Sequence, residues 1–183
     1  MGFHDIELLE GWDLYERVMI EDLLAARRVI RIATANLKFF RVKSPEMKDA
    51  MPIGEVLARL VHRGVAVRLL HAGVPTEPWI DFLRDTELHD ESRFTMRRCP
   101  RVHFKAIIVD DTLLYTGSAN MTGAGLGMRL EDRRNFELGI RTKDADLIKQ
   151  VRSLFDVVWD GFMCDGCGKK DVCPVPLEEP DFG

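Results

Sequence analysis

The chain has 183 residues, a formal net charge of −4 at pH 7 and a hydrophobic fraction of 46%. These values are typical of one globular domain and argue against a disordered chain. No apolar run approaches the length of about 18 residues that a membrane span needs, and the acidic N-terminus lacks the features of a secretory signal. We therefore expect a cytoplasmic protein, in which any nucleic-acid partner is bound by a local basic patch.

The first half of the chain alternates predicted helices and strands. Apolar residues at helical spacing predict a helix over 14–28, and the β-branched run 29–35 predicts a buried strand. A loop over 43–52, broken by two prolines, leads to a predicted helix over 53–62 that Gly64 terminates. A strand over 65–70 completes a strand–helix–strand unit with a parallel crossover, and a short helix is expected over 78–83.

The second half is expected to add antiparallel strands. Strands are predicted over 94–96 and 102–109, and the turn at Asp110-Asp111 joins the latter to a strand over 113–116 as a hairpin. Small residues over 118–127 suit a turn and a short helix. The alternating pattern over 136–141 predicts a strand, and the last helix is predicted over 145–162. The predicted fold is α/β, a mixed sheet with helices on both faces. Residues 1–162 form this domain, and 163–183 form a cysteine-containing tail.

The residues best suited to chemistry lie on the strand over 102–109 and just after its hairpin. His103 and Lys105 are two residues apart, so on a strand their side chains project to the same face. An imidazole beside an ammonium suits phosphate chemistry, because histidine can act as nucleophile or acid and lysine can stabilise negative charge. Gly117 permits a tight backbone at the end of the hairpin, where Ser118 and Asn120 offer neutral donors to phosphate oxygens.

The spacing of these residues resembles the HKD signature of the phospholipase D superfamily: His103-x-Lys105-(x)4-Asp110-(x)6-Gly117-Ser118-x-Asn120, with a further match at Asn135-x-Glu137. The resemblance covers roughly residues 14–160. It implies a phospholipase D-like fold and a two-step exchange of phosphodiesters without a divalent metal. One histidine attacks phosphorus to form a phosphohistidine, while a second protonates the leaving oxygen and then activates water.

This implied mechanism needs two such motifs, and the chain has one. The remaining histidines lack a lysine two positions on; they are His4, His62, His71 and His89. The resemblance therefore implies a homodimer in which a two-fold axis brings two copies of His103 together.

The resemblance also implies a role for each matching side chain. The histidine of the motif would be nucleophile or general acid, and Lys105 and Asn120 would hold the phosphoryl oxygens with help from Ser118. Glu137 matches the family's acidic residue that orients the histidine. Asp110 is assigned mainly a structural role, because its carboxylate can accept hydrogen bonds from the amides of the turn.

Two groups of basic residues flank the motif. Five residues of these groups are candidates for binding the substrate: Arg97, Arg98, Arg101, Arg133 and Arg134. Such groups can be merely solvated, but here they lie where a polyanionic backbone would enter. The chain also lacks an apolar segment suited to acyl chains. We therefore favour an endonuclease acting on DNA or RNA, with a phospholipase or phosphatidyl transferase as the alternative. A non-catalytic nucleic-acid-binding module is the third possibility.

Four cysteines are unevenly placed, with Cys99 before the motif and Cys164-x2-Cys167-x5-Cys173 in the tail. In a reducing compartment this pattern favours a metal site over disulfides. Four thiolates suit Zn²⁺ or a structural [4Fe–4S] cluster, and the arrangement resembles the iron–sulfur staple of RecB-like nucleases. Free or partly oxidised thiols are the other interpretation. A metal centre here would tie the tail to the segment that carries His103.

Overall fold

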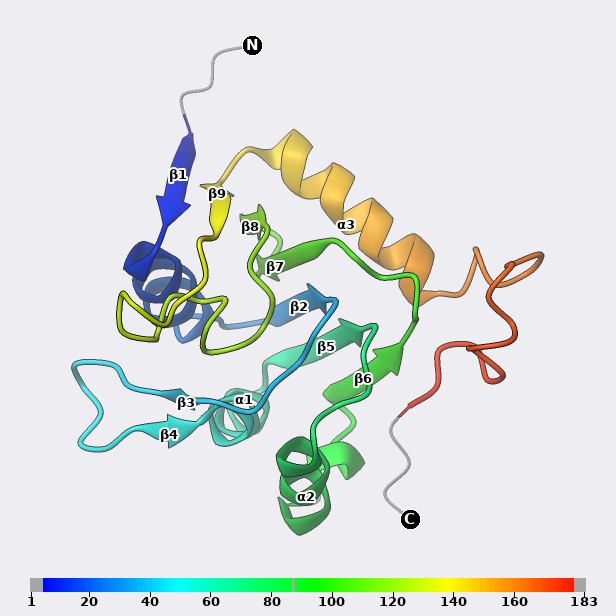
Figure 1. Cartoon of the computed structure of the whole chain (residues 1–183), viewed down its shortest axis with the longest axis horizontal. Coiled ribbons are helices and arrows are strands. Elements are labelled where there is room, and N and C mark those ends of the chain that lie inside the picture. Colours follow the sequence, from blue (N-terminus) through cyan, green and yellow to red (C-terminus); the bar gives the residue numbers. More distant parts are fainter. Residues whose placement is uncertain (1–4, 87, 180–183) are drawn as a thin grey trace.

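The computed structural model describes residues 5–86 and 88–179, and within them a mixed sheet has the order β1-β9-β8-β7-β2-β5-β6 (Figure 1). Its strands are β1 (Ile6–Glu10), β2 (Val29–Thr34), β5 (Ala66–His71), β6 (Phe94–Arg98), β7 (Lys105–Val109), β8 (Leu113–Gly117) and β9 (Leu138–Thr142). A separate two-stranded ribbon consists of β3 (Arg41–Val42) and β4 (Met51–Pro52). The helices are η1 (Leu14–Leu23), a π-helix, α1 (Ile53–His62), α2 (Glu77–Thr86), the short 3₁₀ helix η2 (Leu88–Asp90) and α3 (Ala145–Trp159).

Strand direction divides the sheet into two parts. β2, β5 and β6 run parallel to one another, whereas β1, β9, β8 and β7 pair antiparallel, and β7 joins the two parts by pairing antiparallel with β2. The predicted strand–helix–strand unit is therefore confirmed as β2–α1–β5, with its helix over the predicted residues. The predicted hairpin is confirmed as β7–β8.

Helices cover both faces of the sheet, as the sequence predicts. On one face, Ile30 and Ile32 of β2 pack in the main core with apolar residues of η1 and α1. On the other face, Ala106 and Ile108 of β7 pack against Ile148 of α3. Figure 1 shows α3 and α1 on opposite sides of the strands. None of the described helices combines the length and apolar character needed to cross a bilayer.

The strand β1 was not predicted, because its sequence does not alternate cleanly. Leu8 and Leu9 are adjacent, and β1 lies at the edge of the sheet, where Leu9 is buried and Leu8 is exposed. An edge strand needs only one half-buried face, so its sequence pattern is weak.

The expected short helix within 118–127 is absent, and this part of the β8–β9 connection is a series of turns. The small residues instead allow this loop to lie very close to another segment of the chain. Gly127 has a positive φ of 71°, and a Cβ atom there would lie 1.9 Å from the carbonyl oxygen of Gly11. Glycine therefore allows this loop to lie against the segment that follows β1.

Several other elements begin or end differently from prediction, and α3, for example, ends at Trp159 rather than at residue 162. The first helix ends at Leu23 rather than at residue 28. The strand β7 starts at Lys105 rather than at Val102, because the Val102 amide donates to the carbonyl of Cys99 at 2.9 Å and the chain turns before it joins the sheet. His103 consequently lies just before the strand instead of on it.

Asp110 connects the β7–β8 turn to the start of β2. Its carboxylate accepts backbone N–H groups of Arg27, Arg28 and Val29 at 2.7–2.9 Å, rather than the amides of its own turn as expected. Burial acts to raise the pKa of Asp110, but these amide donors outweigh it and hold the pKa below its usual value. Asp110 also adopts a positive φ of 54°, which asparagine tolerates better than most residues.

We predict that Asp110→Ala lowers the free energy of unfolding by about 2 kcal/mol, because three amides lose a charged acceptor. Asp110→Asn keeps the turn conformation and one acceptor oxygen, so it should cost less. Since the pKa is depressed in the folded state, the stabilisation is present above the unfolded pKa and is lost as pH falls through the folded value. Urea denaturation at neutral and acidic pH measures both effects. An equal stability of wild type and Asp110→Ala at neutral pH would contradict this account.

Candidate active site

Lys105 places an enclosed ammonium at the first position of β7. The residue is 8% exposed, and its Nζ donates to the carbonyl oxygen of His103 at 2.7 Å. No carboxylate among the described residues pairs with it. A buried ammonium without a counter-charge is unfavourable, and it retains two further protons to donate. The position is therefore suited to receive an anion.

His103 lies next to this ammonium and is exposed. Its ring makes no hydrogen bond to any residue that the structure describes, so the imidazole is accessible to a substrate. Phe104 and Ala106 pack toward α3, as predicted. By strand alternation, Lys105 projects to the opposite face of the sheet.

A pair of glycines shapes the strand beside Lys105. Lys105 is opposite Gly117 of β8, which is in turn opposite Gly139 of β9. A Cβ at Gly117 would lie 2.5 Å from the β9 backbone, and one at Gly139 would lie 2.4 Å from the ring of Tyr115. Tyr115 is buried, and this burial raises its pKa to about 12. The glycine of the motif is thus required by the close packing of β8, β9 and this ring.

Ser118 and Glu137 meet where β8 ends and β9 begins. The Ser118 hydroxyl donates to one carboxylate oxygen of Glu137 and accepts the Leu138 amide at 3.1 Å. The other Glu137 oxygen accepts from the Asn135 side-chain amide at 3.0 Å. Within the described residues the carboxylate makes no hydrogen bond to the imidazole of His103. The orienting role expected of Glu137 therefore stays a prediction.

Asn120 is held by residues that the sequence analysis did not single out. Its Oδ1 accepts the backbone amide of Asn36 at 3.0 Å and lies 3.3 Å from the hydroxyl of Thr34. The same hydroxyl accepts the Met121 amide. Because the oxygen of the side chain is engaged, its NH₂ group is left to donate to a ligand. The sequence feature that could have identified Thr34 is its position, because it is a polar residue at the carboxyl end of an apolar strand.

These groups gather at one end of the sheet, which we call the Lys105 end. It is the end at which β2 and β8 finish and β7 and β9 begin. Asp110 lies at the opposite end of β7, about 16 Å from Lys105 at the usual rise per strand residue. Among the predicted catalytic residues, Asp110 is thus placed away from the others and beside β2.

The first group of predicted substrate-binding arginines makes contacts within the chain. Arg97 donates to the carbonyl of Trp159 at 2.9 Å, and its guanidinium lies 4.8 Å from the centre of that ring. Arg98 forms an ion pair with Glu178 at 3.3 Å. Arg101 is exposed and donates to the sulfur of Cys167 at 3.5 Å. These contacts lie toward α3 and the tail.

The second group lies on the loop between β8 and β9. Arg133 is exposed, with its side chain 3.7 Å from Asp132, and Arg134 lies 3.6 Å from Glu131. Both lie within two residues of Asn135 in the sequence. The nearby Arg141 instead forms ion pairs on the η1 side of the sheet.

The other described histidines do not add a second accessible imidazole to this end. His71 is 1% exposed, its Nδ1 lies 2.8 Å from the Gly73 carbonyl, and burial lowers its pKa. His62 ends α1 and precedes β5, so it lies at the far end of the sheet, as does His89 in η2 before β6. His4 lies outside the described residues.

The four cysteines line one cavity of about 520 Å³, although they come from distant parts of the chain. Cys99 lies between β6 and β7, and Cys164, Cys167 and Cys173 follow α3. None of them forms a disulfide. Burial, followed by the charges of the other three cysteines and Asp165, raises the pKa of Cys164. The four predicted ligands thus line one cavity, but within the described residues no three of them converge on a metal position.

We predict that Gly117→Ala lowers the free energy of unfolding by about 2 kcal/mol, because its Cβ would force β8 from β9. Gly123→Ala is the matched control, since a Cβ there would lie 3.5 Å from Phe40, an ordinary contact. Chemical denaturation of both variants measures the difference. Equal stabilities would show that the glycine pair does not set the spacing of these strands.

The chain is similar to known proteins in sequence and in structure. The model of a family described as cardiolipin synthase, PLD-like domain, matches residues 19–159. A search of curated protein sequences gives no match.

Three solved structures share the fold. Nuc from Salmonella typhimurium, described as a phospholipase D family member, is 18% identical with a TM-score of 0.59, and the match covers 85% of this chain and 95% of that one. NucT from Helicobacter pylori is 16% identical with a TM-score of 0.59, covering 82% and 92%. The archaeal chromatin protein TrmBL2, described with a novel mode of DNA binding, is 16% identical with a TM-score of 0.55, covering 87% and 54%. This chain therefore spans about half the length of TrmBL2. At these identities the likeness establishes the fold.

Proposed function

Because the chain belongs to the phospholipase D superfamily, we propose that it is a metal-independent nuclease that forms a phosphohistidine intermediate in a homodimer. The observation that carries this proposal is the enclosed ammonium of Lys105, unpaired among the described residues and adjacent to the exposed imidazole of His103. This arrangement combines a fixed positive charge for a phosphodiester with a nucleophile that is free to attack it.

In the first step, Lys105 and the NH₂ group of Asn120 donate to the non-bridging oxygens of the diester. A ring nitrogen of His103 attacks phosphorus, so that an N–P bond forms as the P–O bond to the leaving group breaks. The leaving oxygen takes a proton from a second imidazolium. In the second step that imidazole removes a proton from water, the water oxygen bonds to phosphorus, and the N–P bond breaks.

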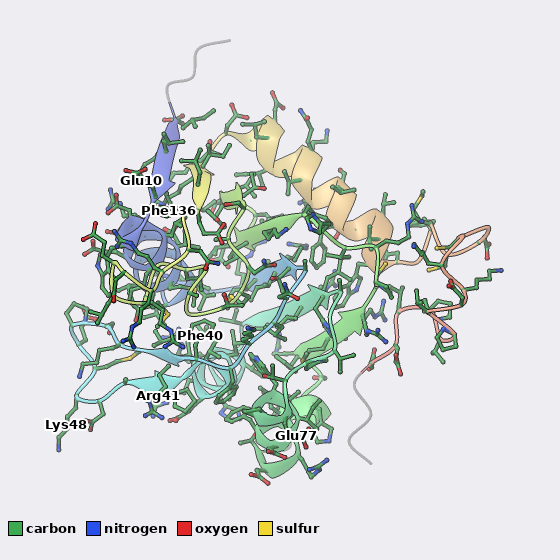
Figure 2. All side chains as sticks on the ribbon, in the orientation of Figure 1. Glu10, Phe40, Arg41, Lys48, Glu77 and Phe136 are labelled. Carbon is green, nitrogen blue, oxygen red and sulfur yellow. The ribbon has the colours of Figure 1, made fainter. Side chains whose placement is uncertain are left out.

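The second imidazole is supplied by another copy of the chain in this proposal. The described part of the chain has no second accessible histidine at the Lys105 end, so one chain carries half of the acid–base pair. Exposed apolar side chains next to Glu137 in the sequence are available for such an interface. Phe136 is fully exposed and Leu138 is about half exposed, on either side of Glu137, and Figure 2 shows Phe136 near Glu10 of β1. Exposed apolar groups in such a cluster are typical of association surfaces.

Nucleic acid is favoured as the substrate over phospholipid. Nuc and NucT resemble this chain over nearly their whole lengths, and Arg133 offers an exposed cation on the β8–β9 loop, two residues before Asn135. The family model described as cardiolipin synthase supports the alternative, a phosphatidyl transferase. Two described cavities are lined by the cysteines or by the buried His71 rather than by the catalytic groups.

We predict that the protein cleaves DNA or RNA in the presence of EDTA and that His103→Ala lowers the rate by a factor of about 10² to 10⁴. Lys105→Met, which keeps an unbranched side chain but removes the charge, should have a comparable effect. His62→Ala is the control, because this exposed histidine lies at the far end of the sheet. Labelled single- and double-stranded DNA, RNA and phosphatidylcholine serve as parallel substrates. Cleavage by His103→Ala at the wild-type rate, or turnover of the lipid alone, would contradict the proposal.

A further inference from the structure

A second site of distinct chemistry lies behind the segment that carries His103. Its cavity of about 520 Å³ is bounded by the β6–β7 connection, the last turns of α3 and the tail, and Cys99, Cys164, Cys167 and Cys173 all line it. Figure 1 shows the tail, in orange to red, extending from the end of α3 toward β6. The tail is anchored there by backbone pairing between Arg98 and Glu178.

Two kinds of metal centre take four thiolate ligands, and they differ in size. Zinc bound by four thiolates has each sulfur at about 2.3 Å, which places the sulfurs within about 4 Å of one another. Within residues 5–86 and 88–179, no three histidine, cysteine or acidic side chains converge closely enough to hold one metal ion. An iron–sulfur cluster holds its cysteine ligands farther apart, because inorganic sulfides and irons lie between them. Four cysteines around a cavity of about 520 Å³ leave room for the larger group.

The surroundings also suit a negatively charged cluster. A [4Fe–4S]²⁺ core with four thiolates carries a net negative charge, and Arg101, Lys169 and Lys170 line the same cavity. Arg101 already donates to the sulfur of Cys167, and hydrogen bonds to ligand sulfurs stabilise such clusters. Apolar side chains complete the wall of the cavity: Val102, Phe104, Leu154, Val157, Val158 and Met163.

We propose that Cys99, Cys164, Cys167 and Cys173 bind a structural [4Fe–4S] cluster in this cavity. The cluster links the tail to the connection between β6 and β7. Val102 and Phe104, on either side of His103, both line the cavity, so the cluster fixes the backbone from which the histidine projects. No step of the diester chemistry passes through it.

The test uses the full chain, purified without oxygen and reconstituted with ferrous iron and sulfide. We expect about four irons and four acid-labile sulfides per chain, with the broad visible absorption of thiolate-ligated iron. The Cys167→Ser variant should contain at least tenfold less iron per chain than the wild-type protein. Met163→Leu is the matched control, because it removes a sulfur atom from the same cavity without removing a thiolate, and it should retain the cluster.

A second measurement uses the wild-type protein, in case Cys167→Ser does not fold. All four cysteines should resist alkylation in the reconstituted protein and become reactive after iron is removed by a chelator. One zinc per chain without iron, or four thiols that react equally before and after reconstitution, would overturn the proposal. Because none of these readouts is diester cleavage, their outcome is independent of the proposed nuclease activity.

Discussion

The constraint on which the site depends is the burial of one positive charge at the first position of β7. The ammonium of Lys105 has a backbone carbonyl as a partner, and no described carboxylate neutralises it. Such a charge is tolerated when an anion completes the site, so the fold holds in place a position that favours phosphate. The neighbouring strands are adapted to it, because the glycine pair of β8 and β9 brings Ser118 alongside.

Around this charge the polar groups are held by the ends of strands rather than by flexible loops alone. Thr34 at the end of β2 and the amide of Asn36 orient Asn120, while Leu138 at the start of β9 orients Ser118. Groups fixed in this way lose little freedom when substrate binds, which is the condition for effective electrostatic stabilisation. The imidazole of His103 differs, since it is exposed and unbound within the described chain. That freedom fits a nucleophile that must form and break a bond.

The sequence predicted those parts of the fold in which local pattern and packing agree. The helix over 53–62 combines a clear apolar stripe with a glycine after its end, and its predicted bounds are confirmed. Prediction failed where tertiary contacts decide. Edge strand β1 has no alternating pattern, and the glycines of the β8–β9 loop serve close approach to Gly11 rather than a helix.

The same distinction applies to the site. The motif spacing identified Lys105, Ser118 and Asn120, which the structure places at one end of the sheet. Spacing could not reveal that Thr34 supports Asn120, because the two lie 86 positions apart. A group of basic residues in the sequence also could not show that the Arg97 guanidinium lies over the ring of Trp159. The number of charged residues in a sequence segment does not show whether a basic side chain is free to bind substrate or already contacts other residues of the protein.

The central claim is that one chain carries half of an active site and that two copies complete it. Its most direct test is to refold wild-type chains with His103→Ala chains in known ratios and measure diester cleavage. If both histidines act in one reaction, activity falls as the square of the wild-type fraction, to about one quarter in an equal mixture of chains that pair at random. A fall in direct proportion to the wild-type fraction, to about one half, would contradict the shared site.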